Sequence, residues 1–452
     1  MADVICDERP LVFEDLVAWF SDGSKAKADW RIGAEHEKFP FYLKDHSPVP
    51  YEGPNGIHAL LTGLMRFGWQ GVFEGDTLIG LERNGANVSL EPGGQFELSG
   101  APLGDLHEIC DETGGHLSEV KTVADELGLG FLGLGFTPTW TRDQIPVMPK
   151  GRYKIMRAYM PKVGGMGLDM MFRTCTVQVN LDFGSEADMV KKFRTSLALQ
   201  PIATALFANS PFTEGKPNGF LSARANVWTD VDPDRTGMLD FVFKDGFGFE
   251  TYANYALDVP MYFVKREGRY IDVAGRSFRE FMEGRLPELP GERPTIKDWA
   301  DHVTTIFPEV RLKYYLEMRG ADAGPWSRLC ALPALWTGLL YDQAALDAAW
   351  DVCKGWSVAD HEGLRSQAAR VGLKAQIDGR TLQDVAKDVL AIARQGLKAR
   401  NRLSGGLVDE TGYLAELDEI ADSGKTPAER MLDLYHGAWK GDLSKAYETL
   451  AF

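Results

Sequence analysis

The chain has 452 residues, and its 65 Asp and Glu residues against 49 Lys and Arg residues give a formal net charge of −16. This acidity argues against nucleic acid as a partner, because nucleic-acid binding needs a basic surface, and it argues equally against anionic membrane surfaces. A composition of 44% hydrophobic and 25% charged residues is typical of a globular protein with a sizeable core and excludes a disordered chain.

The cysteines and the start of the chain indicate the compartment. The five cysteines are scattered and form no Cys-x-x-Cys motif, which argues against a secreted disulfide framework and against a zinc site; they are Cys6, Cys110, Cys175, Cys330 and Cys353. Residues 1–10 lack the basic and apolar regions of a secretory signal. The uncharged stretch 195–213 contains Pro201 and Pro211 and would be a poor membrane span. We therefore expect a cytoplasmic protein.

The apolar spacing predicts helices and strands in alternation along the chain. Helical periodicity predicts helices, in chain order, over 57–67, 103–127, 188–208 with a break or kink at Pro201, 342–354, 382–400 and 427–435. Strict alternation predicts strands over 32–39, 94–99, 176–183 and 315–319. The pattern predicts an α+β fold with a mainly antiparallel sheet, followed by a helical C-terminal section. We expect one catalytic unit over 1–452, with a sheet-bearing core at about 30–338 and the helical section at about 339–452.

Two glycine-containing motifs resemble nucleotide loops, but their context favours ordinary helix ends. Gly128 and the glycines after it match a dinucleotide fingerprint, yet a helix precedes them and a buried strand follows, which is the reverse of the required order. Gly424 is predicted to end one helix, and Thr426 to begin the next with Glu429 in a capping box.

The polar faces of the four predicted strands carry the functional signal. Residues two apart in a strand project from the same face. Each strand has one apolar face, and the opposite faces carry Glu35 and Glu37; Gln95, Glu97 and Ser99; Gln178, Asn180 and Asp182; and Glu317 and Arg319. A solvated sheet face explains any one of these strands, but such faces usually carry Lys and Thr as well.

Four acidic strand faces in one sheet would repel each other unless cations lay between them. Carboxylate and amide oxygens suit Mg²⁺ or Mn²⁺, and the absence of His and Cys from these faces argues against zinc. Magnesium held by few carboxylates usually completes its coordination shell with substrate phosphates. The sequence therefore predicts a sheet face that holds ATP through metal ions.

Two further segments could supply cations for anionic substrates. The segment 149–162 is flanked by glycines, which suggests a mobile loop; the alternative is an ordinary surface loop that aids solubility. Its charged and aromatic residues are Lys150, Arg152, Tyr153, Lys154, Arg157, Tyr159 and Lys162. In a second loop-rich stretch near Trp228, Arg224 or Arg235 could hold a substrate carboxylate through two parallel hydrogen bonds.

Five strings in this chain closely resemble the plant-type glutamate–cysteine ligase family, which also occurs in proteobacteria. They are residues 32–39 (IGAEHEKF), 90–100 (LEPGGQFELSG), 174–182 (TCTVQVNLD), 199–211 (LQPIATALFANSP) and 315–322 (YLEMRGAD). The resemblance extends from about residue 30 to the C-terminus. It implies a glutamine synthetase-like curved antiparallel sheet that carries metal ions and ATP. It also implies ATP-dependent joining of the glutamate γ-carboxylate to the cysteine amine through a γ-glutamyl phosphate, the first step of glutathione synthesis.

The resemblance implies roles for particular residues and ligands. It implies metal ligands at Glu35, Glu37, Glu97, Glu317, Gln178 and Glu91. The expected catalytic cations are Arg319, Arg152 and Arg157, and the last two would belong to a lid. The expected substrate-binding residues are Arg224, Arg235, Asn180 and Tyr159. We expect glutamate, cysteine and ATP as substrates, Mg²⁺ or Mn²⁺ as cofactor, no nucleic acid or membrane partner, and a monomer or homodimer.

Other readings remain open at this stage. A ligase of the same fold could use another acceptor amine, and the same carboxylates could serve a metal-dependent phosphohydrolase or a non-catalytic nucleotide-binding protein. Cys110 and Cys330 match the positions of a cysteine pair found in some plant members of the family. In a reducing compartment we expect them to be buried thiols.

Overall fold

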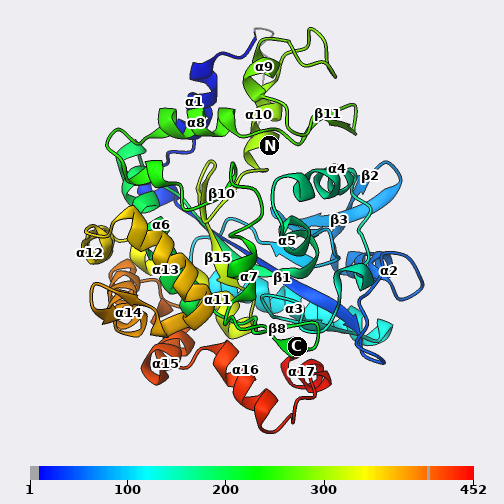
Figure 1. Ribbon diagram of the computed structural model, residues 1–452, viewed down its shortest axis with the longest axis vertical. Coiled ribbons are helices and arrows are strands. Elements are labelled where there is room, and N and C mark those ends of the chain that lie inside the picture. Colours follow the sequence, from blue (N-terminus) through cyan, green and yellow to red (C-terminus); the bar gives the residue numbers. More distant parts are fainter. Residues whose placement is uncertain (1–9, 405–407) are drawn as a thin grey trace.

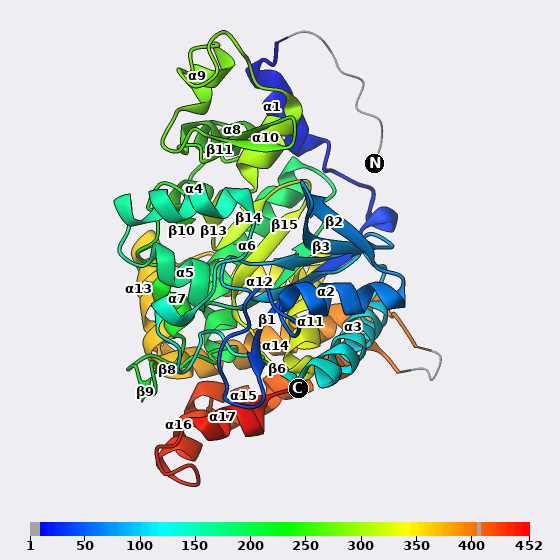
Figure 2. The ribbon, with the colours of Figure 1, turned by 90° about the vertical axis from the view of Figure 1, so that its right-hand side faces the viewer.

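A nine-stranded antiparallel sheet forms the centre of the protein (Figures 1 and 2). The structure, a computed structural model, describes residues 10–404 and 408–452. The strand order is β14-β15-β7-β1-β5-β4-β3-β2, and β6 pairs with the second half of β1. The strands are β1 (Ile32–Tyr42), β2 (Gln70–Glu74), β3 (Thr77–Arg83), β4 (Ala86–Leu90), β5 (Phe96–Ser99), β6 (Leu129–Leu132), β7 (Thr176–Leu181), β14 (Val310–Leu312) and β15 (Leu316–Asp322). The predicted α+β fold with an antiparallel sheet is confirmed.

Helices and short hairpins surround the sheet. The helices are α1 (Phe13–Ser21), α2 (Ile57–Leu64), α3 (Leu106–Leu127), α4 (Gly151–Tyr159), α5 (Gly167–Arg173), α6 (Glu186–Leu206), α7 (Ala223–Val227), α8 (Phe249–Asp258), α9 (Phe278–Met282), α10 (Ile296–Val303), α11 (Trp326–Leu340), α12 (Gln343–Cys353), α13 (Val358–Val371), α14 (Leu382–Arg400), α15 (Ala415–Ser423), α16 (Pro427–His436) and α17 (Ser444–Leu450). The short strand pairs are β8 (Phe212–Thr213) with β9 (Lys216–Pro217), β10 (Thr236–Gly237) with β13 (Phe307–Pro308), β11 (Phe263–Arg266) with β12 (Arg269–Asp272), and β16 (Gln376–Ile377) with β17 (Arg380–Thr381).

The alternating strands bury their apolar faces against these helices. Val177 and Val179 of β7 belong to one buried cluster with residues of α6 and α11. Val88 of β4 and Leu98 of β5 belong to a second cluster with residues of α2 and α3. The opposite face of the same strands, which carries the acidic and amide side chains, is thereby left free for chemistry.

The strongly periodic predictions agree with the structure. Predicted helix 103–127 is α3, 342–354 is α12 with its caps, 382–400 is α14, and 427–435 is α16. Helix α6 continues through Pro201, so of the predicted break or kink the break is absent. Gly128 and Gly424 adopt left-handed conformations at the ends of α3 and α15, and Thr426 caps α16 with Glu429, as predicted.

Several regions differ from the predictions. The segment 149–162 is not a loop, because residues Gly151–Tyr159 form α4 and a short 3₁₀ turn follows at Met160–Lys162. Its apolar positions, among them Ile155 and Met156, are buried against the rest of the protein, and this packing stabilises the helix. The hairpins β2–β3–β4 and the buried helix α11 were not predicted.

The structure also describes four of the five cysteines and tests the helices as membrane spans. Cys110 and Cys330 are free and buried, as are Cys175 and Cys353, while Cys6 lies outside the described residues. The expectation of two buried thiols at Cys110 and Cys330 is confirmed. Within 10–404 and 408–452, no helix is both long enough and apolar enough to cross a membrane.

Candidate active site on the polar sheet face

The predicted acidic strands are neighbours in the sheet. Glu37 of β1 lies directly opposite Glu97 of β5, and Glu35 lies opposite Gln178 of β7. Directly paired residues in an antiparallel sheet have Cβ atoms about 5 Å apart and share one face. Glu35, Glu37 and Glu97 are therefore gathered in the middle of the sheet, as the strand alternation predicted.

The Glu37–Glu97 pair carries the strongest electrostatic conflict of this face. Burial, and then the charge of nearby Glu91, raise the pKa of Glu37 from 4.5 to about 8. Burial also raises the pKa of Glu97 well above its ordinary value, and Glu91, Glu35 and Glu37 add to this effect. The hairpin turn between β4 and β5 brings Glu91 close to the pair, since the Glu91 N–H donates to the Gln95 carbonyl oxygen at 2.9 Å. A bound cation would relieve this repulsion.

The chemistry of this pair fits a magnesium-type ion. Among the residues that the structure describes, no three His, Cys, Asp or Glu side chains form a group that could hold a metal alone. Mg²⁺ is usually bound by one or two carboxylates together with substrate phosphates, so it does not need such a group. Glu37 and Glu97 supply two carboxylates whose charges are only partly offset, by Arg224 and Arg319 at Glu37 and by Lys150 at Glu97.

Glu317 lies on the same face in a different electrostatic setting. It pairs with Asn180 across β15 and β7, and its carboxylate is fully buried. Arg311 of β14 donates to both carboxylate oxygens at 2.7 and 2.9 Å, while Lys313 lies at 2.7 Å and Arg319 also bonds to it. Burial alone would raise the pKa of Glu317, but these three cations hold it well below the ordinary value. Three cations already satisfy the Glu317 carboxylate, so it serves as their anchor and is a weaker candidate ligand than Glu37 or Glu97.

Arg319 is aimed across this face by an irregularity in its own strand. The register between β15 and β7 shifts between Met318 and Ala321, and such bulges commonly redirect a side chain beside an active site. The Arg319 guanidinium bonds to the Gln178 Oε1 atom at 2.6 Å and to Glu317. The Gln178 oxygen predicted as a metal ligand therefore accepts from an arginine. Asn180 donates to Glu35 at 2.7 Å and orients that carboxylate.

A second cation approaches the face from α7. Arg224 is only 3% exposed, its Nη2 atom donates to the Arg319 carbonyl oxygen at 2.8 Å, and its Nε atom has no hydrogen-bond partner. A cavity of about 10 Å³, enough for one water-sized group, lies beside the sheet and is lined by both arginines together with Trp228, Phe307 and Glu309. The Trp228 indole N–H is also buried without a partner. The cavity therefore offers unpaired donors to an anionic or polar ligand.

Helix α4 and the residue before it bring the basic segment to the edge of the face. Lys150 donates to the hydroxyl of Ser89, which lies opposite Glu97 in the β4–β5 pairing, at 2.7 Å. Burial and then the charge of Arg152 lower the pKa of Lys150 from 10.5 to about 8. Arg152 lies 3.9 Å from Glu91.

The outer side of α4 lines a larger cavity. Its volume is about 710 Å³, within the range of small-molecule sites. Lys150, Lys154 and Arg157 contribute cations to it, and Val147 and Met148 contribute apolar surface. Arg157 is exposed there, with its guanidinium 5.8 Å from the Phe172 ring.

Arg235 and Tyr159 lie in a buried cluster separate from the cavity beside Arg224. The Arg235 side chain is fully buried, and its three nitrogens bond to the Asp232 carboxylate and to the carbonyl oxygens of Thr305 and Pro260. Tyr159 is also buried, and its ring contacts Tyr262. Because these bonds use the Arg235 donors within the protein, we place Arg235 outside the site. The burial of Tyr159 in the same cluster also weakens the prediction that it binds substrate.

Two cations of the site were missed by the sequence reasoning. Arg311 and Lys313 neutralise Glu317, and both follow Pro308 in a short segment whose alternation was not recognised. The spacing of these residues ahead of the 315–319 strand was the available signal, since a preceding hairpin strand would place them beside Glu317.

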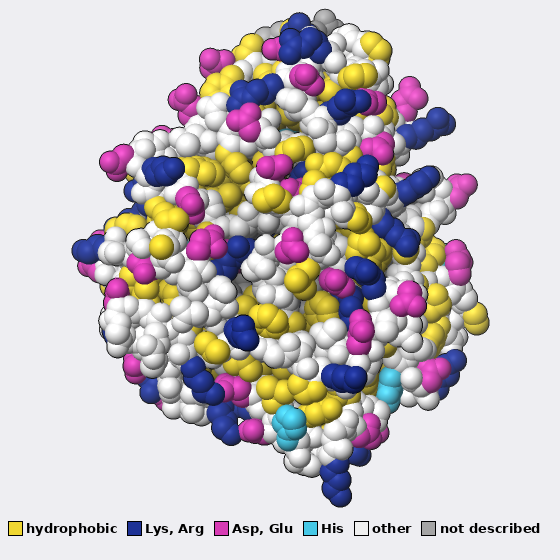
Figure 3. Space-filling model, viewed as in Figure 1, with side chains coloured by type: hydrophobic (Ala, Val, Ile, Leu, Met, Phe, Trp, Pro, Cys, Tyr) yellow, Lys and Arg dark blue, Asp and Glu magenta, His cyan; other side chains and the backbone are white. Residues whose placement is uncertain are grey.

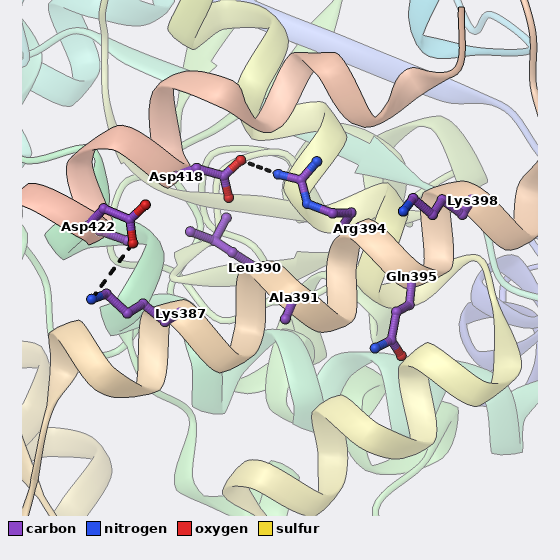
Figure 4. A pocket seen from close by; sticks show the side chains of 9 residues that line it. Lys387, Leu390, Ala391, Arg394, Gln395, Lys398, Asp418 and Asp422 are labelled. Carbon is purple, nitrogen blue, oxygen red and sulfur yellow. Dashed lines mark hydrogen bonds and ion pairs between the residues drawn. The ribbon is translucent and has the colours of Figure 1, made fainter.

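Another groove lies apart from this face, in the helical C-terminal section. The groove between α14 and α15 is lined by ion pairs of Arg394 with Asp418 and of Lys387 with Asp422 (Figure 4). It contains none of the predicted site residues. On the face shown in Figure 3, acidic side chains are interspersed with basic ones, so the net negative charge is not gathered there in one patch.

Comparison with known proteins agrees with the resemblance. Residues 31–449 match the model of the family described as Glutamate-cysteine ligase family 2. The chain is 57% identical over 451 residues to the chloroplastic glutamate–cysteine ligases of Nicotiana tabacum and Arabidopsis thaliana, covering 100% of this chain and 85% of each relative. The structure is similar to that of a glutamate–cysteine ligase from Francisella tularensis in complex with AMP. That likeness has a TM-score of 0.54 at 13% identity and covers 94% of this chain and 89% of that one.

The expected location is wrong. Both plant relatives are named as chloroplastic proteins, and so are those of Medicago truncatula and Oryza sativa at 56% and 55% identity. The prediction of a cytoplasmic protein depended on the composition of the first ten residues and on the cysteines. Neither feature distinguishes a cytoplasmic protein from the mature part of an imported one.

Proposed function

The chain belongs to the glutamate–cysteine ligase family, and from this premise we propose how its polar sheet face performs the reaction. The enzyme joins the γ-carboxylate of glutamate to the amine of cysteine with the consumption of ATP. The product is γ-glutamylcysteine, and the reaction is the first step of glutathione biosynthesis.

The proposed chemistry has two steps. A carboxylate is a poor electrophile, so the glutamate γ-carboxylate first attacks the γ-phosphorus of ATP and forms an acyl phosphate, with ADP as the leaving group. The cysteine amine then attacks the acyl carbon, the C–O bond to phosphate breaks, and the amine loses a proton. No serine or cysteine nucleophile of the protein is required.

Glu37 and Glu97 would hold the divalent cation, with Glu35 and Glu91 beside them. When bound, Mg²⁺ or Mn²⁺ would offset the charge of the ATP phosphates and of the transferring phosphoryl group. Arg319 projects from the same face, and its charge would stabilise the phosphoryl group in transit. Lys150 approaches from the opposite edge of the face through its bond to Ser89.

Arg224 would bind a carboxylate of glutamate beside Arg319, with one carboxylate oxygen in the water-sized cavity that both arginines line. Its unpaired Nε atom and its burial support this assignment, because a buried guanidinium binds a carboxylate strongly through two parallel hydrogen bonds. The cavity along α4, with its three cations and apolar surface, suits the nucleotide. We retain Arg157, which lines this cavity, and Arg152, which lies near Glu91, as phosphate-binding candidates; both are on a helix and not on the loop that was predicted.

The single observation that carries this proposal is the pairing of half-buried Glu37 with buried Glu97 on the sheet face that Arg319 shares. It is tested by incubating the purified enzyme with Mg²⁺, ATP and glutamate, with and without cysteine, and measuring ADP and γ-glutamylcysteine. With cysteine present, we expect ADP and γ-glutamylcysteine to form in equal amounts. Without cysteine, we expect ADP to form far more slowly. Phosphate release without glutamate would indicate a phosphohydrolase, and an equal rate with another amine would indicate a different acceptor.

A further inference from the structure

Helix α13 of the C-terminal section holds α7 at both ends. The Ala369 carbonyl oxygen accepts from the N–H groups of Leu221 and Ser222 at 3.0 and 2.9 Å, and Ser222 caps the start of α7. At the other end, the Nη2 atom of Arg365 donates to the carbonyl oxygen of Trp228 at 2.9 Å. Arg365 and Ala369 are four residues apart and share one face of α13. In Figures 1 and 2, α13 lies beside α7.

The same guanidinium also holds the strand segment on the other side of the small cavity. The Nε atom of Arg365 donates to Glu309 Oε1 at 2.9 Å, and both side chains are only 13% exposed. The backbone of Glu309 in turn accepts from the Arg319 N–H at 3.1 Å. Arg365 thus links the helix that carries Arg224 to the segment that positions Arg319.

This link fixes the distance between the two arginines that face the cavity. Arg224 bonds to the Arg319 carbonyl oxygen at 2.8 Å, and both residues line the cavity with Trp228 and Glu309. Arg365 is absent from the cavity lining and acts through Trp228 and Glu309. A planar guanidinium can donate to two acceptors in fixed directions at once, which a lysine ammonium on its flexible stem does poorly.

Arg365 also keeps Glu309 occupied. The Glu309 carboxylate is close enough to Arg224 to raise its pKa, although burial lowers that pKa overall. Without Arg365, a partly buried carboxylate would lose its ion-pair partner and would compete with a substrate carboxylate for Arg224.

We propose that Arg365 is a positioning residue for the glutamate site, reaching it from the helical C-terminal section. The proposal rests on the proposed role of Arg224 in binding a glutamate carboxylate. Its substitution should weaken the binding of glutamate and leave the binding of ATP largely unchanged, because no bond of Arg365 reaches the Glu37–Glu97 pair or α4.

The test uses Arg365→Met, which keeps the apolar stem and removes both bonds, and Arg365→Lys, which can keep one. Arg370→Met is the matched control, because Arg370 is an exposed arginine on the same helix. For Arg365→Met we expect the KM for glutamate to rise about tenfold, with the KM for ATP within about twofold. Arg365→Lys should lie between the wild-type enzyme and Arg365→Met, and Arg370→Met should match the wild type.

A binding measurement separates this proposal from the proposed function. Glutamate should raise the Tm of the wild-type enzyme and of Arg370→Met, and the concentration needed should be about tenfold higher for Arg365→Met. Equal glutamate requirements for Arg365→Met and Arg370→Met would overturn the role of Arg365 alone. Equal increases in the KM for glutamate and the KM for ATP would mean that Arg365 only stabilises the fold, which would overturn its positioning role. A wild-type enzyme whose Tm does not respond to glutamate would overturn both proposals.

Discussion

Replacing Glu97 with glutamine should stabilise the metal-free protein and inactivate the enzyme. Glu97 lies directly opposite Glu37 in the sheet, is 8% exposed, and has a raised pKa that follows from burial and from the surrounding carboxylates. Glutamine keeps the shape of the side chain and removes one charge of the pair. A purely structural residue would lose stability on such a change, so the two roles predict opposite signs.

The magnitude follows from the separation of the two charges. Carboxylates about 6 Å apart at an effective dielectric constant of about 20 repel by roughly 3 kcal/mol. The entropy of unfolding is about 2.1 cal/mol/K per residue, which gives roughly 0.9 kcal/mol/K for a chain of this length. Removal of the repulsion should therefore raise the Tm by about 3 °C.

The assay is thermal unfolding of Glu97→Gln in a metal chelator at about pH 8.5, above the pKa of about 8 of Glu37. Glu82→Gln is the matched control, because Glu82 is an exposed carboxylate on β3 of the same sheet. Turnover with Mg²⁺ and ATP should fall at least about 100-fold in Glu97→Gln only. A lower Tm for Glu97→Gln, or turnover within about tenfold of the wild type, would refute the reasoning.

Three further changes test other parts of the structure. Arg224→Lys should raise the KM for glutamate at least about tenfold with little change for ATP, because a single ammonium cannot replace the two-pronged guanidinium; an unchanged KM would remove Arg224 from the site. Burial lowers the pKa of His302 from 6.5 to about 4, so the unfolded chain binds an extra proton between these values and stability falls as the pH falls. His302→Gln can still donate to the Ala256 carbonyl oxygen. On acidification, its unfolding free energy should fall by about 2 to 3 kcal/mol less than that of the wild type. The same pH dependence in the variant and the wild type would contradict this. Thr426→Ala removes the cap of α16 and should cost about 1 kcal/mol of stability without changing any KM.

The sequence predicted the central strands because only one of their two faces is apolar. In β7, Val177 and Val179 face the core while Gln178 and Asn180 face the site, and this alternation survives in the sequence. The caps at Thr426 and Gly424 were predictable for a similar reason, since their chemistry is local.

The missed elements have specific physical causes. Helix α11 is buried on nearly all sides, so no helical periodicity marks it. The β3–β4 hairpin did carry a signal, because Asn84 and Gly85 both have positive φ in the turn, as Asn-Gly hairpins require. Helix α4 was predicted as a loop because the glycines and charged residues in and around it hide its apolar periodicity. Its apolar positions can be recognised only from their packing in the structure.

The site itself was only partly predictable. Which carboxylates remain without cations depends on contacts between strands, and Arg311 makes Glu317 differ from Glu37 in this respect. The burial of Arg235 depends on Asp232 and on distant carbonyl oxygens. Residue type alone could not separate it from Arg224.

The most direct test of the account is Mn²⁺ binding in the presence of a non-hydrolysable ATP analogue, measured by calorimetry on the wild type, Glu37→Gln, Glu97→Gln and the control Glu82→Gln. If Glu37 and Glu97 hold the cation, both of their variants should bind Mn²⁺ at least about tenfold more weakly, and Glu82→Gln should match the wild type. Equal Mn²⁺ affinity in all four proteins would contradict a metal site at the centre of the polar sheet face.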